Sequence, residues 1–111
     1  MSLKAQGAVA EAKKLIGTRF LLGGTSPEGF DSPGLVYYCY KQVGVKLPKL
    51  ISKLINMRNT VSQSDLKIGD LVFIKTDEVG IYIGAHRIIY ASKNGVRESS
   101  ITSFYTAKRV E

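Results

Sequence analysis

Ser32 stands at the junction of a glycine- and proline-rich loop with a helix that is expected to begin at Ser32-Pro33. A nucleophile at a helix N-terminus benefits from free N–H groups and aligned peptide dipoles, and a thiolate benefits most. The only cysteine, Cys39, lies seven residues further along and is expected in the core. Ser32 therefore has two interpretations, a nucleophile or a helix N-cap. We favour the cap, because a cap needs no neighbouring base.

Spacing of apolar residues predicts an α+β domain, with helices first and antiparallel strands afterwards, in a single domain over 1–111. Three- and four-residue spacing predicts a helix over 5–16 followed by Gly17, and a second helix from Ser32 to Gly44. A loop over 18–31 joins them. The remaining expected elements are a short helix over 50–55 and strands over 71–75, 79–83, 87–92, 96–98 and 104–110.

Positive charge dominates the chain, which has a formal net charge of +7. No acidic residue occurs between Asp31 and Asp65. The basic residues in that window are Lys41, Lys46, Lys49, Lys53 and Arg58. A segment of one sign favours an anionic partner, whereas the alternative is a solvated face that only aids solubility. Nucleic acid is the weaker choice of anion, because no nucleic-acid motif is present.

Several classes of site are not expected. One cysteine cannot form an internal disulfide, and a single histidine cannot assemble a zinc site. No residue pattern indicates an organic cofactor. We expect no membrane span, because there is no apolar run of about 18 residues. No signal peptide is visible, so localisation stays open, as does the question of whether the chain is part of a longer exported protein.

Five stretches, in this order, resemble one family: IGTRFLLGG (16–24), GFDSPGLV (29–36), GDLVF (69–73), VGIYIG (79–84) and IYAS (89–92). They are similar to the NlpC/P60 family, papain-like cysteine peptidases that cut the peptide stems of bacterial peptidoglycan. The resemblance implies a papain-like fold, with N-terminal helices packed on an antiparallel sheet of about five strands. It also implies an extracellular or cell-envelope location.

The same resemblance implies that four functional positions differ from the family pattern. The motif Asp-Cys-Ser-Gly is here Asp31-Ser32-Pro33-Gly34, so Ser32 occupies the nucleophile position. Glu78 occupies the position of the base histidine, Tyr90 that of a second histidine, and Phe20 that of a tyrosine. From these positions we expect a chain that is not an enzyme, a binding or scaffolding module of the cell envelope. The residues expected to contact its ligand are Phe20, Asp31, Ser32, Glu78 and Tyr90.

Two other functions stay open. A weak cell-wall peptidase or acyl-transfer enzyme of altered chemistry would use Ser32 as nucleophile and Glu78 as base. An anionic-polymer binder would use the basic stretch 41–58. The expected partners are therefore peptidoglycan peptides, an anionic wall polymer or another protein. Simpler roles also exist: Glu78 pairs with a nearby lysine or arginine, Tyr90 fills space, and His86 lies in an exposed turn.

Overall fold

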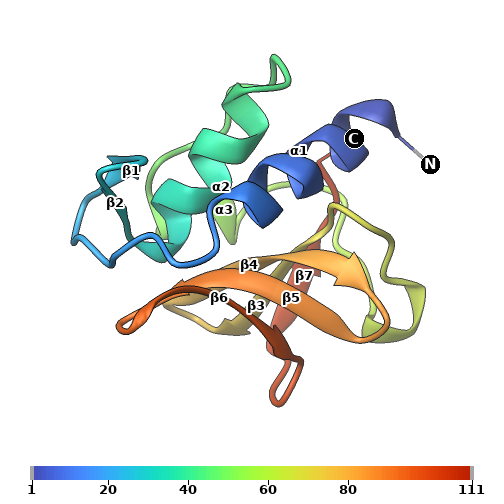
Figure 1. The fold of residues 1–111 in the computed structure, drawn as a ribbon. Coiled ribbons are helices and arrows are strands. Elements are labelled where there is room, and N and C mark those ends of the chain that lie inside the picture. The colour runs from blue at the N-terminus through green and yellow to red at the C-terminus, as the bar shows by residue number, and fades with distance from the viewer. Residues whose placement is uncertain (1, 111) are drawn as a thin grey trace.

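One antiparallel sheet supports the molecule, and the helices cover one of its faces (Figure 1). The computed structural model describes residues 2–110. The sheet strands are β3 (Leu71–Lys75), β4 (Glu78–Gly84), β5 (Arg87–Ser92), β6 (Gly95–Ser100) and β7 (Thr106–Lys108). Their order across the sheet is β6-β5-β4-β3-β7, and all neighbours are antiparallel. The predicted α+β class with a five-stranded sheet is confirmed, although β7 is shorter than the expected 104–110.

Within the described part of the chain, three α-helices precede the sheet: α1 (Leu3–Lys14), α2 (Ser32–Lys41) and α3 (Ile51–Leu54). The buried side of α1 is built mainly from alanines, and small side chains let it pack closely against α2. Helix α1 begins two residues earlier than predicted, because the Ser2 hydroxyl accepts a hydrogen bond from the Ala5 N–H at 3.2 Å. Helix α2 ends at Lys41, before Gly44, whose φ of 84° stops any continuation.

Alternating side chains divide the apolar residues of the sheet between two clusters. Leu71 and Phe73 of β3 belong to the cluster on the helix side of the sheet, which also contains Cys39 of α2. Val72 belongs to the cluster on the opposite face. The cluster on the far face consists of Val61, Val72, Ile88, Ile101 and Ala107, with Leu66, Ile74, Tyr82, Tyr90 and Phe104 packed around it. The main core therefore lies between α1, α2 and the sheet, as the helix and strand periodicities require.

The glycine-rich loop contains a small ribbon that sequence patterns did not predict. Strands β1 (Thr25–Ser26) and β2 (Gly29–Phe30) pair antiparallel around Pro27-Glu28. A short 3₁₀ helix, η1 (Gln63–Asp65), was also missed. The ribbon gives the loop a defined shape and leads directly into α2.

Loop backbone covers parts of both outer edges of the sheet. Along β6, the Val96 N–H donates to the Thr18 carbonyl, and the Gly17 N–H donates to the Val96 carbonyl, each at 2.8 Å. Along β7, the Val61 N–H donates to the Ala107 carbonyl at 2.9 Å. The edge strands therefore have partners within the same chain.

An ion pair fastens the segment after β7 to the start of β3. Asp70 is only 2% exposed, and its Oδ1 and Oδ2 accept hydrogen bonds from Nε and Nη2 of Arg109 at 2.9 and 2.8 Å. Oδ2 also accepts the Lys67 N–H at 2.8 Å. The hydrogen bond to Asp70 raises the pKa of the Arg109 guanidinium above its usual value. We call this arrangement the Asp70–Arg109 clamp.

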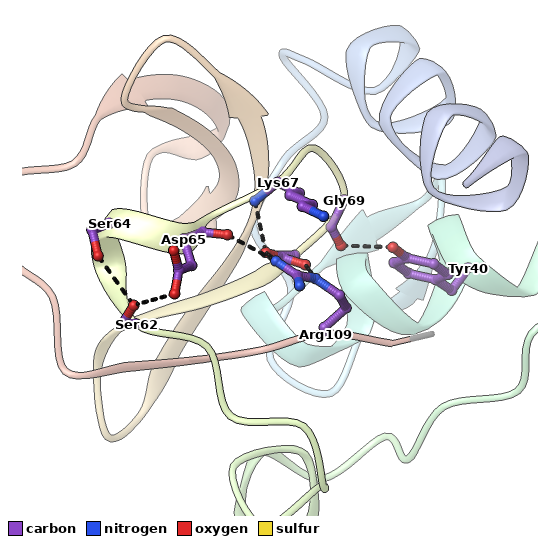
Figure 2. Close-up of polar contacts among 8 residues, drawn as sticks. Tyr40, Ser62, Ser64, Asp65, Lys67, Gly69 and Arg109 are labelled. Carbon is purple, nitrogen blue, oxygen red and sulfur yellow. Dashed lines mark hydrogen bonds and ion pairs between the residues drawn. The ribbon is translucent and has the colours of Figure 1, made fainter. Parts of the chain in front are cut away.

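Figure 2 shows how the clamp joins distant parts of the chain. Arg109 Nη2 reaches the Asp65 carbonyl at 2.9 Å, and the Tyr40 hydroxyl donates to the Gly69 carbonyl at 2.6 Å. Helix α2, the loop before β3 and the segment after β7 thus meet at one point. The polar groups here bind one another, which is typical of a structural role.

Neither a membrane-spanning helix nor a metal-binding cluster is found within residues 2–110. No helix in that range is long and apolar enough to cross a membrane. No group of three or more His, Cys, Asp or Glu side chains in the same range could hold a metal ion.

Candidate functional site

A cleft of about 580 Å³ opens where the N-terminus of α2 meets the turn between β3 and β4. A volume of this order is within the usual range for a small-ligand site. The cleft brings together Phe20, Asp31, Ser32 and Glu78, four of the five residues predicted to contact a ligand. Its full lining is Phe20, Leu22, Asp31, Ser32, Pro33, Ile51, Lys75, Asp77, Glu78, Ala91 and Lys93. We call it the Ser32 cleft.

Ser32 is the first helical residue of α2 and is 5% exposed. Its Oγ accepts a hydrogen bond from the Val79 N–H of β4 at 3.2 Å. The predicted cap role of Ser32 is therefore wrong. Asp31 is the N-cap, because its extended backbone lets its carboxylate accept the Gly34 N–H at 2.8 Å. The serine hydroxyl instead ties the helix to the sheet.

Asp31 also holds the loop in place, since its second carboxylate oxygen accepts the Gly23 N–H at 2.8 Å. The loop lies so close to α2 that a Cβ at Gly34 would be 1.8 Å from the Gly24 carbonyl oxygen. Only glycine fits there. The pair of hydrogen bonds to Asp31 therefore fixes how the loop meets α2 and shapes one wall of the cleft.

Glu78 begins β4 and is half-buried in the opposite wall. Its Oε1 lies 3.3 Å from Nζ of Lys75 across the turn Thr76-Asp77, so the simpler expectation of a lysine pair describes this structure. Asp77 and Lys93 are exposed, and within residues 2–110 no carboxylate–cation pair involves either of them. The Ser32 cleft thus presents an open carboxylate and an open ammonium group.

Tyr90 is not among the cleft residues. It lies on β5 opposite Gly80 of β4 and packs with the far-face cluster around Val72 and Ile88. The reason is strand alternation: Ile89 packs in the core on the helix side, so Tyr90 points away from it. Of the five residues expected to contact a ligand, Tyr90 is therefore the one that does not line the Ser32 cleft.

Cys39 and His86 have the surroundings expected of them. Cys39 is fully buried, and its pKa is raised to about 12, first by burial and second by the nearby Glu11 carboxylate. Such a thiol stays protonated at neutral pH and is no nucleophile. His86 is exposed in the turn between β4 and β5, where its backbone N–H donates to the Tyr82 hydroxyl at 3.1 Å.

Sequence reasoning missed three charged residues of the cleft: Lys75, Asp77 and Lys93. Lys75 and Asp77 lie at the turn between β3 and β4, and Lys93 lies in the turn between β5 and β6. The gaps between the expected strands 71–75 and 79–83, and between 87–92 and 96–98, did locate these turns. What the sequence lacked was the information that both turns meet the N-terminus of α2.

The family model described as the NlpC/P60 family matches residues 17–111, which is most of the chain. The chain belongs to the NlpC/P60 family. Among its relatives is murein DD-endopeptidase MepH of Escherichia coli (strain K12), which is 38% identical over 106 residues, covering 86% of this chain and 39% of MepH. Murein DD-endopeptidase MepS/murein LD-carboxypeptidase of the same organism is 37% identical over 99 residues, covering 84% of this chain and 53% of its own length.

The fold of this NlpC/P60 chain agrees with solved structures of the family. The crystal structure of the NlpC/p60 domain of the peptidoglycan hydrolase SagA superposes with a TM-score of 0.87 at 31% identity. The match covers 95% of this chain and 97% of that one. The papain-like NlpC/P60 fold expected from the resemblance is thereby confirmed.

The expectation that this NlpC/P60 chain is not an enzyme is contradicted. Relatives that are 35–38% identical to it are named endopeptidases, so the chain lies within a family of peptidoglycan hydrolases. The expectation rested on Ser32, Glu78, Tyr90 and Phe20, whereas the similarity extends over 84% of the chain or more. Three of these four residues, Phe20, Ser32 and Glu78, line a cleft in this structure, with the Ser32 hydroxyl at the start of α2.

Proposed function

We propose that this domain binds the peptide stems of peptidoglycan in the Ser32 cleft. The observation that carries this proposal is the cleft itself, whose lining includes the exposed Asp77 carboxylate and Lys93 ammonium. A stem peptide offers carboxylate and amino groups that complement charges of both signs. The names of the relatives MepH and SagA, a murein endopeptidase and a peptidoglycan hydrolase, support the same substrate class.

Apolar contacts complete the proposed binding site. Leu22 is 84% exposed on the loop before β1, and Phe20 and Ile51 flank the same cleft. An extended peptide lying over Ser32 would cover these side chains with the methyl and methylene groups of its own residues. Asp77 and Lys93 would then set its direction, because one attracts an ammonium and the other a carboxylate.

Hydrolysis through Ser32 is a second candidate, favoured by the position of its hydroxyl at the N-terminus of α2 within the cleft. Oγ would form a bond to the peptide carbonyl carbon as the C–N bond breaks, with its proton passing through Glu78 to the departing amine. Water would then attack the acyl–Ser32 ester, giving one proton to Glu78, and Glu78 would return that proton to Oγ as the acid leaves. Glu78 now pairs with Lys75, and Oγ accepts the Val79 N–H. The reaction therefore requires Glu78 to leave Lys75 and approach Ser32.

Purified stem peptides, added to the whole chain while its amide NMR shifts are recorded, test the binding proposal. We expect shifts around Ser32, Leu22 and Lys93, and several-fold weaker binding for Asp77→Asn and Lys93→Gln. Lys13→Gln is the matched control, because it removes one exposed charge outside the cleft. Unchanged shifts at millimolar peptide would contradict the proposal.

The same samples, followed by mass spectrometry of the peptide products, test the second candidate. Turnover that disappears in Ser32→Ala but survives in Cys39→Ala would assign the reaction to Ser32. Turnover that persists in Ser32→Ala would exclude Ser32 as nucleophile, while the shift titration would still report on binding.

A further inference from the structure

Four lysines gather around Tyr37 on the surface formed by α2, α3 and the segment between them. Two hollows of about 340 and 480 Å³ both include Tyr37 and Lys46 in their linings. Lys41 lines the first, and Lys49 and Lys53 line the second. We call Lys41, Lys46, Lys49 and Lys53 with Tyr37 the Tyr37 lysine patch. Arg58, which the sequence grouped with them, lines neither hollow.

The tyrosine ring holds two of these charges in place. Nζ of Lys41 lies 5.7 Å from the centroid of the Tyr37 ring, and Nζ of Lys49 lies 5.0 Å from it. Both distances are within the range of a cation–π attraction, which offsets part of the repulsion between two ammonium groups. The two cations are therefore partly ordered before any anion arrives.

Within the described residues, no carboxylate neutralises the patch. Neither hollow is lined by Asp or Glu, and within residues 2–110 none of the four lysines takes part in an ion pair. This agrees with the absence of acidic residues between Asp31 and Asp65. Four exposed, unneutralised ammonium groups in one place produce a positive potential that attracts a multiply charged anion.

The surroundings of Tyr37 narrow the kind of anion. Tyr37 is only 8% exposed and lies beneath the lysines, so its ring offers no open face on which a nucleic-acid base could stack. Helix α3 has only four residues and provides no long amphipathic face of the kind that lies in a lipid interface. The patch is therefore suited to a flexible chain that is recognised through its charges alone.

We propose that the Tyr37 lysine patch binds a linear phosphodiester polymer of the cell wall, of the poly(glycerol phosphate) type. Repeated phosphates on a flexible backbone can reach several lysines at once without bases or acyl chains. Helix α3 links this patch to the Ser32 cleft, because Ile51 lines the cleft while Leu50 and Lys53 line the second hollow. A polymer bound here would keep the cleft close to the wall, and this proposal stands whether or not the cleft binds stem peptides.

Titration of the whole chain with a poly(glycerol phosphate) oligomer at two salt concentrations tests the proposal. Four phosphate contacts with a flexible strand should weaken binding about 50-fold between 50 and 200 mM NaCl. The double variant Lys46→Gln with Lys49→Gln should bind at least about tenfold more weakly at 50 mM NaCl, with the salt effect reduced to about sevenfold. Both substituted lysines are exposed, so circular dichroism should show an unchanged fold.

The matched control is Lys4→Gln with Lys13→Gln, which removes the same charge from exposed positions of α1. We expect it to change affinity less than twofold. Equal losses in the two double variants, or no binding at 50 mM NaCl, would overturn the proposal. So would tenfold tighter binding of single-stranded DNA with the same number of phosphates, or equal binding to phosphatidylglycerol vesicles.

Discussion

Asp31 and Asp70 each brace a loop with both carboxylate oxygens, but their surroundings differ. Asp70 is buried and receives two hydrogen bonds from Arg109, so charge meets charge inside the protein. Asp31 is half-buried at the Ser32 cleft and receives only backbone N–H groups. Around Asp70 the polar groups hydrogen-bond to one another. In the cleft beside Asp31, Asp77 and Lys93 form no ion pair with any other residue of 2–110. The difference separates a region that holds the chain together from one available to a ligand.

The largest effect should come from breaking the Asp70–Arg109 clamp. Arg109→Met leaves the buried Asp70 carboxylate without its partner, so we expect the free energy of unfolding to fall by about 3 kcal/mol. Urea unfolding measures this directly. Asp77→Asn, at the open cleft, should change stability by less than about 0.5 kcal/mol. Similar losses in the two variants would remove the distinction between the two regions.

Asp31→Ala should have a smaller effect of about 2 kcal/mol, because the variant loses the cap of α2 and the brace to Gly23 together. Asp31→Asn should recover about half of that loss, since its amide oxygen can still accept the Gly34 N–H. Thermal unfolding of the two variants checks this order. Equal stability of Asp31→Ala and the unsubstituted chain would mean that the loop is held by other contacts.

Cys39 offers a third test, because it is buried on α2, the helix whose N-terminus lines the Ser32 cleft. Its pKa is raised to about 12 when folded, from 9.0, so above pH 9 the unfolded thiol loses its proton while the folded thiol keeps it. The stability it contributes is complete below pH 9 and is lost as the pH rises towards 12. We expect a decline of about 1 kcal/mol for each pH unit, relative to Cys39→Ala. Parallel curves for the two proteins between pH 9 and 11 would contradict a buried thiol.

Local rules were enough for most of the fold. Helix periodicity located α1 and α2, and it also placed Cys39 in the core, because that residue shares the buried side of α2. Glycine and proline signals marked the turns, and the apolar runs marked the strands. These features depend on neighbours a few residues apart, which the sequence displays directly.

The features that sequence reasoning missed depend on contacts between distant residues. Ser32 was assigned as a cap, but its hydroxyl bonds to Val79, 47 residues away. The clamp between Asp70 and Arg109 spans 39 residues, and no local pattern indicates it. The position of Tyr90 was also missed, although it does not depend on distant contacts. Strict alternation along β5 would have placed its side chain on the face opposite that of Ile89.

The loop backbone that covers the sheet edges limits how this domain can associate with other chains. Val96 of β6 already pairs with Gly17 and Thr18, and Ala107 of β7 pairs with Val61. At these positions an extended peptide cannot join the sheet as an additional strand, and copies of the domain cannot pair edge to edge there. The segments that follow α1 and α3 therefore protect the sheet edges from strand addition at these positions.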